Sequence, residues 1–150
     1  MFIDMRFGRL LTRRLSLLRG SKGPSQLGKK GEEAACRFLK KNKYKIVERG
    51  YRSPHGEIDI IAYDRKVLVF VEVKTRRSSE FGLPEESVNW RKQQRIRKIS
   101  QHYLYHHKLQ GVDCRYDVVS IDLSARDEGR VTLIKDAFQL MDRGISGNSI

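Results

Sequence analysis

The spacing of apolar residues divides most of the chain into helical and extended segments. Apolar residues recur every three or four positions in two segments and fill shorter runs rich in β-branched and aromatic residues. The predicted helices span residues 27–41 and 89–108, and the predicted strands span 45–51, 58–63, 67–75, 116–121 and 131–134. This order predicts an α/β domain with a mixed β-sheet flanked by helices. Residues 137–142 are expected to add a terminal turn or short helix.

The two central strands carry acidic residues within apolar sequence. Residues 65–66 are expected to form a two-residue turn that joins these strands into a hairpin. In that register Asp59 faces Glu72, with their Cβ atoms roughly 4.5–5.5 Å apart. Glu57 then faces Lys74, and strand alternation places all four side chains on one face. A turn longer by one residue would shift this register.

Two interpretations of the acidic hairpin follow from the residues alone. Two carboxylates at cross-strand distance repel each other unless positive charge lies between them, and their burial is costly without compensation. A divalent ion such as Mg²⁺ or Mn²⁺ would supply that charge and suits phosphodiester hydrolysis, with a lysine beside it. In the other interpretation this face is solvated, and the acids and lysine are ordinary cross-strand pairs. The hairpin alone favours neither interpretation.

The charge composition predicts a class of partner. The 150 residues carry a net charge of +13, which favours a polyanionic partner. Residues 1–30 contain eight Lys or Arg and one acid, so much of the excess charge lies near the N-terminus. We expect a basic flexible extension over residues 1–24, one domain over 25–142 and a flexible tail over 143–150. An amphipathic helix on anionic lipid is the alternative for the extension, which is too short and charged to span a membrane.

The second predicted helix is strongly basic. Residues 87–112 contain no carboxylate, and Asn89 is a suitable N-cap. An ordinary solvated face is one interpretation, but so long an acid-free run favours contact with a phosphate backbone. The basic residues assigned to nucleic-acid binding in and before this helix are Arg76, Arg77, Arg91, Lys92, Arg95 and Lys98.

The first predicted helix offers one more acid. Glu32 shares its helical face with Ala35 and Leu39, whereas Glu33 shares the opposite face with Arg37. Glu32 is therefore the acid that would point toward the hairpin. Its alternative role is a first-turn acid that interacts favourably with the helix dipole. The two cysteines are far apart without metal-ligand spacing, which is typical of reduced thiols in the cytoplasm.

A series of short motifs in a fixed order gives the chain a family resemblance. The motifs are Gly31-Glu32, Gly56-Glu57-Ile58-Asp59, Phe70-Val71-Glu72-Val73-Lys74-Thr75-Arg76, Lys92-Gln93, Arg115-Tyr116-Asp117-Val118-Val119 and Asp136-Ala137-Phe138. Over residues 28–138 the chain resembles the YraN-type bacterial proteins. That family is similar to the restriction-endonuclease-like PD-(D/E)xK superfamily and, within it, to archaeal Holliday-junction resolvases.

The resemblance implies roles for particular residues. Asp59 matches the metal-binding aspartate of the superfamily, although the usual preceding proline is absent. Glu72 and Lys74 match the second metal ligand and the catalytic lysine. Glu32 matches an acidic residue that the resolvase-like branch contributes from its first helix, as a further metal ligand. Gln93 matches a polar residue that supports the site, and Glu57 is a possible accessory residue.

The resulting hypothesis is a cytoplasmic endonuclease that uses Mg²⁺ or Mn²⁺ to hydrolyse DNA, with branched, Holliday-junction-like DNA among its candidate substrates. Symmetric cutting by related resolvases would favour a homodimer. Two alternatives stay open: a non-catalytic nucleic-acid-binding protein that retains a nuclease fold, and an interaction protein whose basic tail binds membrane or ribosome.

Overall fold

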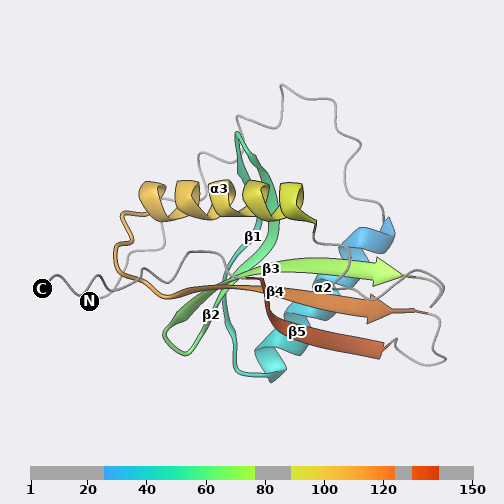
Figure 1. Ribbon diagram of the computed structural model, residues 1–150. Coiled ribbons are helices and arrows are strands. Elements are labelled where there is room, and N and C mark those ends of the chain that lie inside the picture. The colour runs from blue at the N-terminus through green and yellow to red at the C-terminus, as the bar shows by residue number, and fades with distance from the viewer. Residues whose placement is uncertain (1–25, 77–88, 124–129, 139–150) are drawn as a thin grey trace, which may run out of the picture.

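The computed structural model describes residues 26–76, 89–123 and 130–138. The elements are α2 (Gln26–Lys41), β1 (Lys45–Ser53), β2 (Gly56–Asp64), β3 (Val67–Arg76), α3 (Trp90–His106), β4 (Cys114–Asp122) and β5 (Arg130–Phe138) (Figure 1). Their order is the predicted one. The proposed N-terminal extension, the C-terminal tail and Arg77 lie outside the described residues.

The strands form one mixed sheet in the order β1-β2-β3-β4-β5. Neighbouring strands are antiparallel except β3 and β4, which run parallel and are connected across one face by α3. Two consecutive parallel strands need such a crossover, because a tight turn reverses the direction of the chain and joins only antiparallel strands. The mixed α/β class is therefore confirmed, and it is consistent with a restriction-endonuclease-like fold.

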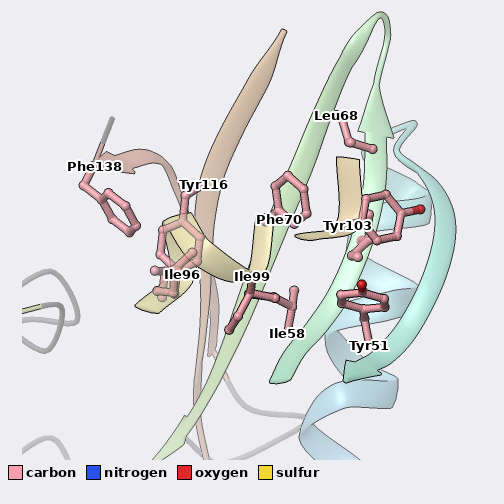
Figure 2. Packing of buried hydrophobic residues seen from close by; sticks show 11 residues of the cluster. Tyr51, Ile58, Leu68, Phe70, Ile96, Ile99, Tyr103, Tyr116 and Phe138 are labelled. Carbon is pink, nitrogen blue, oxygen red and sulfur yellow. The ribbon is translucent and has the colours of Figure 1, made fainter. Parts of the chain in front are cut away.

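The two helices cover opposite faces of the sheet (Figure 1). On one face, Ala35 and Leu39 of α2 pack against alternate valines of β3, including Val69 and Val71. On the other face, Ile96, Ile99 and Tyr103 of α3 pack over Ile58, Phe70 and Tyr116, as Figure 2 shows. Both faces of β3 are thus buried in its first half, which is typical of a central strand.

The predicted register of the central hairpin is confirmed over most of its length. Arg65 lies in the turn with a φ of 57°, and the cross-strand pairs run from Asp64–Val67 to Ile60–Val71. These pairs require the two-residue turn that the sequence predicted. The backbone ladder ends at Ile60–Val71, one residue before the acids, which matters for the site below.

The end of the described chain differs from the prediction. Residues 137 and 138 continue β5 and do not begin a terminal helix or turn. Phe138 pairs with Tyr116 across the strands, and their rings lie 4.6 Å apart in the core under α3. Burial of a large aromatic side chain stabilises the extended backbone there. A register shift after Tyr116, with a φ of 53° at Asp136, adjusts the strand to this contact.

A buried ionic network links Asp117 of β4 to Asp64 beside the β2–β3 turn. Asp117 is fully buried and accepts hydrogen bonds from Arg115 Nε at 2.8 Å, from the backbone N–H of Asp136 at 3.0 Å and from the Tyr44 hydroxyl at 3.2 Å. Arg115 also contacts Asp64 at 2.8 Å, so the network joins β2, β4 and β5 with the turn before β1. None of the helices in the described part of the chain is long and apolar enough to cross a membrane.

Candidate active site

Glu72 has more hydrogen-bond and salt-bridge partners than the other acids predicted for the site. It lies on β3 beyond the buried half of the strand, and Lys74 from the same strand contacts its Oε1 at 2.7 Å. Lys92 from α3 reaches the same oxygen, and the hydroxyl of Tyr116 on β4 donates to Oε2. Three elements therefore converge on one carboxylate.

Asp59 lies where β2 and β3 separate. Its Oδ2 accepts a hydrogen bond from the backbone N–H of Val73 at 2.7 Å, so a side chain replaces the next backbone contact of the ladder. Alternation also breaks here, because Ile58 packs under α3 while Ile60 packs under α2. Gly50 of the neighbouring strand β1 lies opposite Asp59 and has a φ of 61°. The irregular backbone aims Asp59 into the gap between the strands.

Two hollows meet at Asp59. The larger, of about 270 Å³, lies on the α2 side and is lined by Leu27, Gly28, Glu32, Asp59, Val73, Lys74 and Thr75. The smaller, of about 70 Å³, lies on the α3 side and is lined by Glu57, Ile58, Asp59, Glu72, Arg95 and Ile96. Asp59 thus links Glu32 on one side with Glu72 on the other.

Burial and nearby charge change the acidity of these groups in opposite directions. Burial, together with the charges of Glu72, Glu32 and Glu57, raises the pKa of Asp59 to about 6, although the Val73 hydrogen bond acts against this. Burial would also raise the pKa of Glu72. Hydrogen bonds from its two lysines and the tyrosine outweigh that effect and hold its pKa below the usual value. Asp59 therefore differs from Glu72 in forming no salt bridge within the described residues, although Lys74 lines the same hollow.

Close packing of α2 positions Glu32. Gly31 is buried, and a Cβ on it would lie 2.0 Å from Oγ1 of Thr75 on β3. Only glycine allows the helix to approach the strand so closely. Glu32 then lines the hollow while Glu33 is exposed, as the helical spacing predicted.

Glu57 is not placed as the predicted register requires. It pairs with Arg52 of β1 and forms a 3.0 Å salt bridge with that residue, so it does not face Lys74. The reason is the separation of β2 from β3 below Ile60, which leaves Glu57 paired on its β1 side only. Glu57 still lines the smaller hollow.

The basic residues divide into two groups. Lys92 is directed at Glu72 and not at solvent, and the stem of Arg95 lies across Gly56 at the smaller hollow. Arg91 and Lys98 are exposed on α3. Half-buried positions are occupied by Gln93, next to Lys92 on α3, and by Arg76 at the end of β3.

The residues fit a magnesium site in which the protein supplies only one or two carboxylate ligands. Among residues 26–76, 89–123 and 130–138, no three His, Cys, Asp or Glu side chains converge closely enough to hold a metal ion. Mg²⁺ needs less, since it keeps several waters and takes one or two carboxylates together with substrate phosphates. Asp59 and Glu32, which line one hollow, supply oxygen donors of that kind. The donor chemistry therefore suits Mg²⁺ or Mn²⁺.

Tyr116 is a site residue that the sequence reasoning did not single out. A signal was present, because a tyrosine in a buried strand needs a partner for its hydroxyl. We expect Tyr116→Phe to destabilise the protein by about 1–3 kcal/mol at neutral pH, as a hydrogen bond to a charged acceptor is lost. Urea unfolding measures this, with Tyr105→Phe, whose side chain is exposed, as the control. Equal stability of both variants and the unmodified chain would contradict the role of the Tyr116 hydroxyl.

The chain is similar to a set of bacterial proteins that share one family name. Residues 31–121 match the family model described as "Uncharacterised protein family UPF0102". A "UPF0102 protein" of Syntrophus aciditrophicus is 50% identical over 114 residues, covering 75% of this chain and 88% of the relative. Those of Alkaliphilus metalliredigens and Caldicellulosiruptor bescii are 43% and 46% identical over 112 and 115 residues, covering 75% of this chain and 96% and 97% of the relatives. These names state no activity.

Proposed function

Since the chain belongs to the uncharacterised protein family UPF0102, which confirms its likeness to the YraN-type proteins and assigns no activity, we propose a function from the site itself. The function is metal-dependent hydrolysis of phosphodiester bonds in nucleic acid, with DNA as the substrate. The resemblance to the PD-(D/E)xK nucleases supports this proposal, and so does the net charge of +13.

The observation that carries the proposal is the placement of Asp59. This carboxylate is inserted into the gap between two central strands, and burial, with a smaller contribution from three other carboxylates, raises its pKa. A largely buried carboxylate that forms no salt bridge in the described part of the chain is costly to the fold, and such groups are typical of functional sites. A divalent ion would relieve the repulsion.

The chain's own residues have distinct roles in this proposal. Asp59 and Glu32 would hold the ion, with Glu72 as the third candidate ligand. When bound, the ion supplies Lewis-acid stabilisation of the phosphate and an acidified water. The Lys74 ammonium, which contacts Glu72, would orient the attacking water or stabilise charge on the phosphate. Lys92, which contacts the same carboxylate, would help to neutralise that charge.

One observation favours a second function, a non-catalytic nucleic-acid-binding protein. Two lysines already neutralise Glu72, so its carboxylate is stable without a metal ion. Such a protein would bind nucleic acid in a salt-sensitive manner without a divalent ion. It would bind equally well after Glu72→Gln.

A substrate panel tests the proposal. End-labelled duplex, flapped, four-way and single-stranded DNA, with RNA counterparts, are incubated with the full chain in Mg²⁺, Mn²⁺ or EDTA. We expect cleavage of DNA with either ion and none in EDTA. Glu32→Gln should lower the cleavage rate and the calorimetric Mn²⁺ affinity by about 10- to 100-fold.

The matched control is Glu33→Gln, which removes the same charge from the exposed neighbour on α2. It should cleave as the unmodified chain does. Absence of cleavage across the panel would overturn the proposal, and metal-independent binding in the same samples would favour the second function.

A further inference from the structure

The single tryptophan of the chain is exposed on the basic helix. Trp90 is the first residue of α3 and keeps 69% of its surface accessible, and Tyr105 near the other end keeps 85%. Asn89 caps the helix by accepting a hydrogen bond from the backbone N–H of Lys92 at 3.0 Å, which fixes the first turn. A large exposed aromatic side chain at an ordered helix end gains nothing from the core of this domain.

These aromatic side chains share one face with basic and amide groups. A helix turns about 100° per residue and rises 1.5 Å, so Trp90 and Tyr105 lie within about 60° of each other around the axis and about 22 Å apart along it. The α3 outer face between them consists of Trp90, Arg91, Gln94, Lys98, Gln101 and Tyr105. The opposite face carries the buried Ile96, Ile99 and Tyr103.

The side chains of the α3 outer face suit a nucleic acid with unpaired bases better than a duplex. Residues 89–112 contain no carboxylate, so phosphates meet no repulsion along the helix. Arg91 and Lys98 suit phosphates of any nucleic acid, but an indole ring does not improve a phosphate contact. Bases in a duplex already stack on one another, whereas unpaired bases have free faces that stack on aromatic side chains regardless of sequence.

We propose that the α3 outer face binds single-stranded nucleic acid, with unpaired bases stacked on Trp90 and Tyr105 and phosphates held by Arg91 and Lys98. Lys92, two residues after Trp90, contacts Glu72. The Trp90 end of the α3 outer face therefore lies on the same helical turn as a residue of the candidate site. Binding by this face does not depend on cleavage. Its consequence for substrate choice, a preference for DNA with an unpaired segment, rests on the proposed function.

The intrinsic fluorescence of the full chain tests the proposal, because Trp90 is its one indole. Titration with oligo(dT) in EDTA should quench the emission, in parallel with the anisotropy of a labelled oligonucleotide. A blunt duplex with the same number of phosphates should bind with little quenching. Trp90→Leu should weaken oligo(dT) binding about tenfold, and Trp90→Phe should retain most of the affinity.

Several outcomes would overturn the proposal. These are binding of oligo(dT) without a change in emission, equal quenching by the duplex, and equal oligo(dT) affinity of Trp90→Leu and the unmodified chain. A response only to anionic vesicles, or only to protein concentration, would assign the face to lipid or to a second copy of the chain. Because EDTA prevents metal-dependent cleavage, this result is independent of whether the proposed nuclease activity exists.

Discussion

Asp59→Asn should abolish cleavage and, without metal, make the protein more stable above pH 6. The amide keeps the shape of the side chain and its acceptor for Val73, but it removes the charge that burial and three carboxylates disfavour. Loss of that charge from the proposed metal site should lower the cleavage rate by on the order of a hundredfold or more. Function and stability are thus expected to change in opposite directions.

The pH dependence follows from the raised pKa of Asp59. Raising a carboxyl pKa from 3.8 to about 6 in the folded state costs ~3 kcal/mol of folding free energy at pH values above both. The cost decreases as the pH falls through 6, because the folded protein binds the proton first, and it is small by about pH 4. Urea unfolding in EDTA at pH 8 and pH 4.5 should therefore give a larger stability gain for Asp59→Asn at pH 8.

The control is Asp113→Asn, which makes the same chemical change at an exposed position. It should alter stability by less than about 0.5 kcal/mol at both pH values. A destabilised Asp59→Asn at pH 8 would refute the electrostatic account. An Asp59→Asn protein that cleaves at the original rate would refute the catalytic one.

Asp117→Ala should destabilise the fold by about 3–5 kcal/mol, because it leaves the Arg115 guanidinium half-buried without its main partner. The carboxylate also holds the backbone N–H of Asp136 and the Tyr44 hydroxyl, so its loss affects β5 and the start of β1 together. Tyr44→Phe removes only the hydroxyl, which donates to Asp117 and accepts from Arg115, and should cost less, about 1–2 kcal/mol.

A double-mutant cycle separates the ion pair from the other contacts. Arg115→Met combined with Asp117→Ala should cost clearly less than the two single changes added together, since each single change leaves one charge of this pair without the other. Urea unfolding of the four proteins at pH 7 measures the coupling. Additive costs would show that the pair contributes no energy of its own.

The sequence predicted the fold, and part of the geometry of the candidate site, wherever a local rule applied. The two-residue turn determined the register from Asp64–Val67 to Ile60–Val71, and helical spacing separated Glu32 from Glu33. Both inferences depend on the periodicity of side-chain directions, which follows from the local geometry of a strand or a helix.

The features that escaped prediction depend on irregular backbone or on contacts between distant segments. The strands separate at Asp59 because a carboxylate replaces a backbone acceptor, and strict alternation does not describe that geometry. Glu57 therefore pairs with Arg52 and does not face Lys74. The hydroxyl of Tyr116 reaches Glu72 from a parallel strand, so this contact depends on a crossover whose position no local pattern specifies.

The separation of these partners along the chain has a consequence for synthesis. Tyr116 follows Glu72 by 44 residues, and the two meet only when β4 has paired with β3 beneath α3. Such long-range parallel pairing forms late, since loop-closure entropy must be overcome first. On a ribosome that is still extending the chain, the basic helix is complete while the acidic centre is not. The segment proposed to bind nucleic acid is therefore synthesised before the groups proposed to cut it are assembled, so the proposed hydrolysis would require the finished domain.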